Sequence, residues 1–248
     1  MSNILEKIDQ ADWEGAMELF SKRLDEGSIT EEESVIGATI LEHFQEWESM
    51  YDIITYGLGL NPQNYELYML LGNYYALRNV DQTYLSYENA LYLAEKQNAL
   101  EDADVIRNII KDLCNGNTIT VRNVSFIILS FNTKEFTELC IDSIRKKCKK
   151  ECYEIVVVDN ASTDGSIEWL KEQDDIILIA NDKNVGFPAG CNQGVQHANP
   201  ENDVFLLNND TLMMDNSLFL LRMGLYEKKN VGALYTLWRR FGAPGRPQ

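Results

Sequence analysis

Long apolar runs are absent from this 248-residue sequence, and none approaches the roughly 18 residues that a membrane-spanning helix needs. The first residues, MSNILEKIDQAD, carry acidic side chains early and lack the basic and then apolar pattern of a signal peptide. The five cysteines are odd in number and form no C-x-x-C pair, which argues against a disulfide framework and a zinc site. We therefore expect a cytoplasmic protein with reduced thiols and no membrane span.

Basic residues are scarce in the first part of the chain. Residues 1–120 contain 22 Asp and Glu against 7 Lys and Arg, whereas residues 121–248 contain 17 against 15, so the first part carries most of the net charge of −17. Because an acidic surface repels phosphate backbones, we expect no nucleic acid partner. The nearly neutral second part can still accept an anionic ligand.

Two glycine-rich nucleotide-binding motifs are also missing. The first predicted strand is followed by SFNTKEF and not by G-x-G-x-x-G, and no G-x-x-x-x-G-K-[ST] occurs anywhere. A nucleotide-binding oxidoreductase of the Rossmann type and a P-loop enzyme therefore both lack the motif that would support them.

A 34-residue period is present in the first part of the chain. Trp13, Trp47 and Asp81 are separated by 34 residues each time, and helix-like segments lie between them. This pattern, over about residues 10–98, resembles tetratricopeptide repeats. We predict a tetratricopeptide-like helical domain at residues 1–118, which would offer a surface to a protein or peptide partner. A generic helical bundle with chance periodicity is the alternative.

After this helical part, short apolar runs rich in β-branched residues alternate with helix-like segments. Such alternation predicts parallel βαβ units, whose ligands bind beyond the carboxyl ends of the strands. The expected strands are VSFIILSF (124–131), YEIVVVDN (153–160), DIILIAN (175–181) and VFLLNND (204–210). We predict a Rossmann-like α/β domain with a mostly parallel sheet at residues 119–238. Residues 239–248, rich in Arg, Gly and Pro, are expected to be a disordered or non-native tail.

Every predicted strand ends in polar residues. The first strand ends with Ser130, the apolar Phe131 and Asn132. The others end with Asp159 and Asn160, with Asn181 and Asp182, and with Asn208, Asn209 and Asp210. A single Asn or Asp at such a place is usually a turn former or a helix cap, and Asp164 is expected to be a cap. Four coincident strand ends indicate a ligand site at one edge of the sheet.

Four segments, in this order and spacing, resemble the nucleotide-sugar half of family 2 glycosyltransferases with the GT-A fold. They are VSFIILSFNT, VVVDNASTDGS, NVGFPAGCNQG and FLLNNDT, and the resemblance covers about residues 121–236. It implies a glycosyltransferase whose donor is a nucleotide diphosphate sugar.

The resemblance assigns nucleotide-sugar binding to Ser130, Phe131, Asn132, Asp159, Asn184, Gly186, Asn192, Asn208 and Asn209. Phe131 stands where the family usually has a tyrosine, so it keeps stacking on the base without the hydroxyl. Asp159 matches the acid that holds the base or the ribose. The segment from Asn184 to Gly194 matches the family's N-x-G-F region, where small residues would admit a close approach to the nucleotide sugar.

The segment 208–210 matches the family's Asp-x-Asp motif with its first acid replaced by Asn208. The resemblance makes Asp210 the anionic ligand of a metal, Mn²⁺ or Mg²⁺, and makes Asn209 a ribose or phosphate contact. Charge leads to the same expectation, because a carboxylate can face a diphosphate only with a cation between them.

The catalytic residue is expected beyond the C-terminus. In the resembled family the base is a carboxylate well downstream of the metal motif, and transfer inverts the sugar's configuration. Only 38 residues follow Asp210 here, and the acids among them, Asp215 and Glu227, are expected to cap or face solvent. We therefore expect a C-terminally truncated domain that binds a donor without efficient transfer. A noncatalytic nucleotide-sugar-binding protein, or a repeat-type interaction protein, is the alternative.

Overall fold

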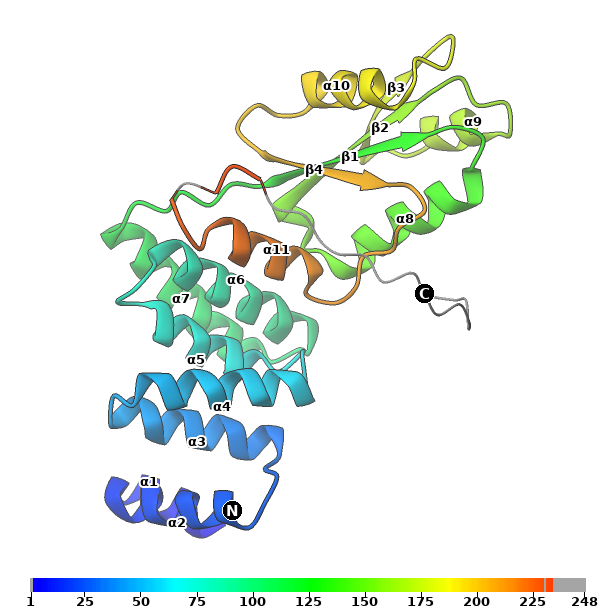
Figure 1. Ribbon diagram of the computed structural model, residues 1–248. Helices are drawn as coiled ribbons and strands as arrows, with labels where there is room; N and C mark the ends of the chain where they lie inside the picture. Colours follow the sequence, from blue (N-terminus) through cyan, green and yellow to red (C-terminus); the bar gives the residue numbers. More distant parts are fainter. Residues whose placement is uncertain (1, 230, 234–248) are drawn as a thin grey trace, which may run out of the picture.

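A computed structural model describes residues 2–229 and 231–233, and Figure 1 shows a stack of helices below an α/β part. The helices of the stack are α1 (Ser2–Asp9), α2 (Trp13–Asp25), α3 (Glu31–His43), α4 (Trp47–Leu60), α5 (Tyr65–Tyr75), α6 (Val80–Lys96) and α7 (Leu100–Gly116). Successive helices pack as antiparallel hairpins, of which α3 with α4 and α5 with α6 have the closest contact. The predicted tail at 239–248 lies outside the described residues.

Contacts between successive hairpins follow the 34-residue period. Trp13, which begins α2, stacks on His43 at the end of α3 with ring centroids 4.1 Å apart. One repeat further on, Trp47 begins α4 and faces the guanidinium of Arg78 at 5.2 Å. These equivalent contacts are what a helical repeat predicts. The assignment to tetratricopeptide repeats in particular stays a prediction.

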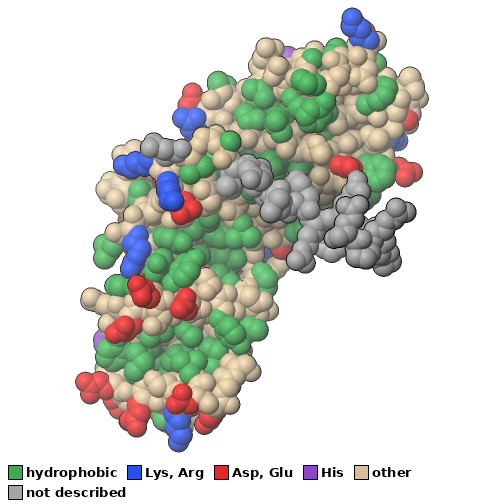
Figure 2. All heavy atoms as spheres, viewed as in Figure 1, with side chains coloured by type: hydrophobic (Ala, Val, Ile, Leu, Met, Phe, Trp, Pro, Cys, Tyr) green, Lys and Arg blue, Asp and Glu red, His purple; other side chains and the backbone are tan. Residues whose placement is uncertain are grey.

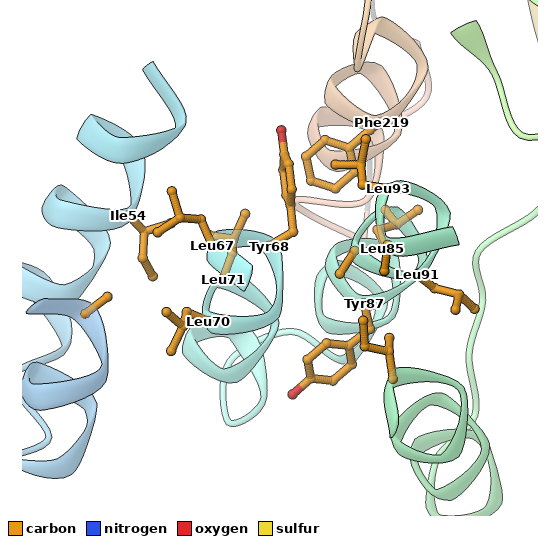
Figure 3. Close-up of a cluster of buried hydrophobic side chains, with 14 of the residues drawn as sticks. Ile54, Leu67, Tyr68, Leu70, Leu71, Leu85, Tyr87, Leu91, Leu93 and Phe219 are labelled. Atoms are coloured by element: carbon orange, nitrogen blue, oxygen red, sulfur yellow. The ribbon is translucent and has the colours of Figure 1, made fainter. Parts of the chain in front are cut away.

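The helical stack has its own apolar core, centred on α5 and α6. Leu67 of α5 and Leu85 and Leu93 of α6 are at most 1% exposed, and Figure 3 shows Leu67 beside Ile54 of α4 and the two α6 leucines on the other side of Tyr68. The acidic character of this part lies outside the core, and Figure 2 shows acidic side chains gathered on the surface of the N-terminal helices.

The α/β part contains β1 (Val124–Ser130), α8 (Lys134–Lys147), the 3₁₀ turn η1 (Lys150–Cys152), β2 (Tyr153–Asp159), α9 (Ser166–Lys171), β3 (Ile176–Ala180), α10 (Phe187–His197), β4 (Asp203–Asn208) and α11 (Ser217–Leu225). The described strands form a four-stranded parallel sheet in the order β3-β2-β1-β4. The predicted fold class, a helical region followed by a GT-A-like α/β domain, is confirmed.

Alternate residues of each strand face opposite layers, because side chains of a strand point to its two faces in turn. Phe126 and Ile128 of β1 pack in the core formed with α8 and α9, which also contains Ile141 of α8. Ile127 faces the other side, where α10 covers the sheet. Both faces of β1 and β2 are buried, and this explains their continuous apolar sequences.

Helix α11 lies between the helical stack and the sheet (Figure 1). Phe219 meets the ring of Tyr68 in an edge-to-face contact with centroids 5.1 Å apart. Figure 3 shows the Phe219 ring, which comes from α11, beside Tyr68 in the core of the helical stack. The side-chain amide of Gln82 in α6 donates to the carbonyl of Met223 (3.1 Å). The predicted division at residues 118 and 119 stays a prediction, and α11 joins the two parts.

None of the described helices is long and apolar enough to cross a membrane.

Candidate functional site at the carboxyl ends of the strands

The carboxyl ends of the strands are level with one another. Ser130 is in register with Asp159, Asp159 with Ala180, and Leu129 with Asn208. The edge formed by these ends and by the loops that follow them is called the rim here. Its position is the one at which open α/β sheets bind ligands.

After β1, the chain is fastened to the loop that follows β2. Asn132 has a left-handed backbone (φ 53°), its N–H donates to Ser162 Oγ (2.9 Å), and its Oδ1 accepts from the Thr163 N–H (2.8 Å). Ser130 is buried, whereas Phe131 is 45% exposed. Phe131 therefore presents an aromatic face at the rim, while the polar side chains around it hold the two loops together.

Asp159 is fully buried at the end of β2. Its Oδ1 accepts from the Ser162 N–H and its Oδ2 accepts from the Ser162 hydroxyl, both at 2.7 Å. The carboxylate thus folds the turn that follows β2. This geometry gives Asp159 a structural role in shaping the rim.

A network of side-chain amides, which the sequence analysis did not identify, lies beneath the loop after β3. Asn181 and Gln193 exchange two hydrogen bonds (2.9 and 3.0 Å), and Asn181 also donates to Asn160 Oδ1 (3.0 Å). The network fixes α10 to the ends of β2 and β3. Asn160 and Asn181 were visible as strand-end residues, but nothing in the sequence distinguishes Gln193 from other polar residues of a helix.

Helix α10 begins at the rim. Asn184 Oδ1 accepts from the N–H of Gly186 (2.8 Å), whose positive φ of 83° is readily adopted by glycine. A Cβ at Gly190 would lie 2.8 Å from Leu129, and one at Gly194 would lie 2.3 Å from Ile127. These two glycines therefore let α10 pack closely on β1, while Asn192 lies exposed on the same helix.

The end of β4 carries the segment that resembles a metal motif. Asn209 donates to Thr133 Oγ1 (2.6 Å) and Thr137 Oγ1 (3.0 Å), which ties the loop to the start of α8. The Asn208 side chain is exposed. Asp210 is exposed too, and it makes no hydrogen bond or ion pair with any of the described residues.

Asp210 is an exposed carboxylate at the rim that remains available to a cation, and Asp182, which follows β3, is a second one. The described residues contain no group of three or more His, Cys, Asp or Glu that could hold a metal. Mg²⁺ does not require one, because it keeps several waters and is commonly held by one or two carboxylates together with substrate phosphates. A single free carboxylate therefore fits a metal that arrives with a diphosphate.

Asp164 acts as the predicted cap. Its carboxylate accepts from the N–H groups of Lys134 (2.9 Å) and Ser166 (3.1 Å), which begin α8 and α9. Its hydrogen bonds, the strongest from the Ser166 hydroxyl, lower the pKa of this carboxyl. Asp164 thus satisfies helix ends and is not free to hold a ligand.

The parallel sheet and the polar rim define an open α/β domain whose candidate ligand site lies at the carboxyl ends of the strands. Residues 125–247 match the model of glycosyl transferase family 2, and this part of the chain belongs to that family. The chain is 31% identical over 129 residues to the poly(ribitol-phosphate) beta-glucosyltransferase of Bacillus spizizenii. That match covers 50% of this chain and 20% of the relative, so the chain spans about a fifth of the relative's length.

Solved structures of glycosyltransferases are also similar. TarS of S. aureus in complex with UDP-GlcNAc is 22% identical with a TM-score of 0.37, and the match covers 42% of this chain and 31% of that one. A mannosyltransferase from Pyrobaculum calidifontis, in complex with GDP-Man and Mn²⁺, is 24% identical with a TM-score of 0.38 and coverages of 42% and 32%. The family assignment rests on the sequence matches.

Proposed function

We propose that this chain binds a nucleotide diphosphate sugar at the rim together with Mn²⁺ or Mg²⁺, as the donor half of an inverting glycosyl transfer. The observation that carries the proposal is the exposed, unpaired carboxylate of Asp210 at the end of β4. An unpaired carboxylate beside a diphosphate would repel it, whereas a divalent cation between the two reverses the interaction. When bound, the metal supplies Lewis-acid stabilisation of the departing diphosphate.

The residues of this chain supply shape and orientation. Phe131 offers a ring on which a base can stack. The first turn of α10, which begins at Phe187, brings free backbone N–H groups and the positive end of the helix dipole to the rim. Asp159 and Asn132 hold the two loops that flank this space. Ser130, Asn184, Gly186, Asn192, Asn208 and Asn209 complete the proposed donor site.

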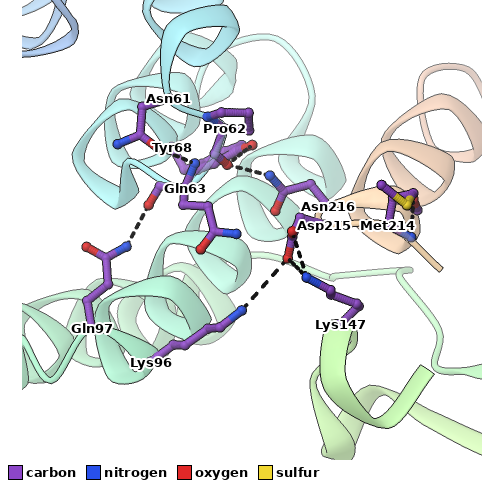
Figure 4. Close-up of polar contacts among 11 residues, drawn as sticks. Asn61, Pro62, Gln63, Tyr68, Lys96, Gln97, Lys147, Met214, Asp215 and Asn216 are labelled. Carbon is purple, nitrogen blue, oxygen red and sulfur yellow. Dashed lines mark hydrogen bonds and ion pairs between the residues drawn. The ribbon is translucent and has the colours of Figure 1, made fainter. Parts of the chain in front are cut away.

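The acids that follow Asp210 give this chain little means of activating an acceptor hydroxyl. Asp215 is held by Lys147 (2.8 Å) and lies 3.9 Å from Lys96, as Figure 4 shows, so its carboxylate belongs to the contact between the two parts of the chain. Glu227 follows the end of α11 and lies 3.9 Å from Lys228. Neither acid offers a free base at the rim. We therefore propose that the chain binds the donor and transfers the sugar slowly. Its turnover rate should lie far below the roughly 10 per second of a typical enzyme.

The helical repeats are proposed to bind a protein or peptide partner. They add a second, acidic surface to a domain whose own chemistry is at the rim. This role is independent of donor binding.

Calorimetric titration tests donor binding. UDP-glucose, UDP-GlcNAc and GDP-mannose are titrated into the whole chain with Mn²⁺, with Mg²⁺ and with EDTA. We expect binding of at least one donor that needs the metal, and a loss of at least about tenfold in affinity in Asp210→Ala. Asp174→Ala is the matched control, because Asp174 is also exposed but precedes β3 at the opposite end of the sheet. Failure of every donor to bind, or equal binding by Asp210→Ala and wild type, would contradict the proposal.

A further inference from the structure

A cavity of about 40 Å³ lies between the two parts of the chain, away from the rim. One buried water needs on the order of 10–15 Å³, so this space holds more than a single water. Its walls include Glu88 and Asn89 of α6, Lys147 at the end of α8, Lys149 in the segment that follows it, and Arg222 of α11. Three elements that are distant in the sequence therefore meet around one polar space.

Two of the residues that line the cavity carry buried N–H groups that make no hydrogen bond of normal geometry with any described residue, although the Asn89 amide also acts on the Tyr68 hydroxyl. They are the Nδ2 of Asn89 and the Nε of Arg222, and the two residues are 9% and 4% exposed. Buried donors in native proteins nearly always have a partner, either from the protein or from a bound molecule. The missing partner must accept hydrogen bonds, because both unsatisfied groups are donors.

The charges around the cavity leave one positive charge uncompensated. Arg222 is paired with Glu88, and Lys147 is paired with Asp215 (2.8 Å; Figure 4). Lys149 is half-buried, and its ammonium group makes no ion pair or hydrogen bond with any described residue. Among these residues the net charge is therefore one positive unit.

The thiols in the cavity wall do not compensate that charge. Cys148 and Cys152 both line the space, and burial raises the pKa of each thiol to about 12. Both are therefore neutral at physiological pH, and each offers only a weak S–H donor and a weak sulfur acceptor.

We propose that this cavity binds a small monovalent inorganic anion, such as chloride, between the helical stack and the α/β part. The anion accepts hydrogen bonds from Asn89 and Arg222 and neutralises Lys149. A water molecule could accept the same hydrogen bonds but would leave the charge of Lys149 uncompensated. Because α6, α8 and α11 all contribute groups, the bound anion stabilises the contact between the two parts of the chain.

Thermal unfolding of the full chain tests the proposal. Chloride is titrated against gluconate at constant sodium concentration and ionic strength, since gluconate is too large for the cavity. A ligand that binds only the folded state raises the unfolding midpoint, and once its concentration exceeds Kd the rise follows the logarithm of that concentration. We expect this rise in the wild type and at least a tenfold weaker apparent chloride affinity in Lys149→Gln.

Lys150→Gln is the matched control, because Lys150 is exposed, belongs to the same basic run and does not line the cavity. It should respond to chloride as the wild type does. Asn89→Asp, which replaces the donor by an acceptor, should abolish the response. If that variant does not fold, the comparison of Lys149→Gln with Lys150→Gln decides. A wild-type midpoint that does not depend on chloride, or an unchanged response in Lys149→Gln, would overturn the proposal.

Crystals grown or soaked in bromide give the direct observation. We expect an anomalous peak within hydrogen-bonding distance of Asn89 Nδ2 and Arg222 Nε. Ordered water at that place, with no anomalous peak at high bromide concentration, would show that the cavity is only hydrated and would contradict the anion site. This outcome is independent of whether the rim binds a nucleotide sugar.

Discussion

Asp159 ends the buried strand β2 and Asp210 follows the partly exposed strand β4 of the same sheet, and their surroundings differ completely. Asp159 is fully buried and accepts two hydrogen bonds from Ser162. Asp210 is exposed and has no partner among the described residues. The sequence shows both as acids at strand ends, and only the three-dimensional structure separates the buried acid that shapes the loop from the exposed one. Nucleotide-sugar binding by Asp159 stays a prediction.

Replacing Asp159 by Asn should destabilise the fold. The new NH₂ group cannot accept a hydrogen bond, so either the N–H or the hydroxyl of Ser162 loses its buried acceptor. Leaving such a group unsatisfied costs about 1–3 kcal/mol, which urea denaturation can measure. Asp182→Asn, at an exposed strand-end position, should change the stability by less than about 0.5 kcal/mol. Equal effects of the two substitutions would refute this role for Asp159.

Asp175 should contribute to acid sensitivity. Hydrogen bonds from Arg145 lower the pKa of this carboxyl in the folded state, while its unfolded value is about 3.9. The stabilisation is therefore complete above the unfolded pKa and is lost as the pH falls through the lower, folded pKa. The thermal midpoints of wild type and Asp175→Asn should differ by a constant amount above about pH 5 and converge as the pH falls below the unfolded pKa of about 3.9. A difference that widens on acidification would show the opposite linkage.

At the scale of elements, alternation of apolar runs and helix-like segments was enough to place the strands. The strand predicted at 124–131 corresponds to β1 (Val124–Ser130), and the strand predicted at 153–160 corresponds to β2 (Tyr153–Asp159). These strands are buried on both faces, so their sequences are continuously apolar and easy to recognise. The docking of α11 on α6 could not be predicted in this way, because its contacts join residues more than 130 positions apart, such as Gln82 and Met223.

The contact of α10 with the sheet should depend on Gly194. A Cβ there would lie 2.3 Å from Ile127, so Gly194→Ala forces the helix or the strand to move. Such overpacking costs about 1–3 kcal/mol in denaturant unfolding. Gly59→Ala is the control, since Gly59 lies in α4 with open space around it. It should stabilise by about 0.5–1 kcal/mol, because alanine favours a helix. The same sign for both variants would contradict the packing argument.

At the scale of the whole molecule, the ion pair between Arg222 and Glu88 joins the helical stack to the α/β part. Both side chains are at most 13% exposed. Replacing Glu88 by Gln leaves the Arg222 charge buried without its partner, which should cost about 3–5 kcal/mol. Urea denaturation, monitored by tryptophan fluorescence, measures this loss in the free energy of unfolding. Glu95→Gln, in the exposed pair with Arg107, should cost at most about 1 kcal/mol. A loss below 1 kcal/mol in Glu88→Gln would mean that α11 does not depend on this pair.

The sequence also indicated the two-part organisation, through its acidic first part and the 34-residue period. It could not indicate the cavity between the parts, because Asn89, Lys149 and Arg222 come from three separate segments with no shared pattern. Sites inside one motif are visible in a sequence, whereas sites made by docking are visible only in the folded chain.

The most direct measurement for the central claim is a crystal of the chain soaked with a uridine diphosphate sugar and Mn²⁺. The account predicts an anomalous manganese peak that contacts both the Asp210 carboxylate and the diphosphate, with the base beside Phe131. A nucleotide bound at the rim with no manganese at Asp210, or manganese bound elsewhere, would contradict it.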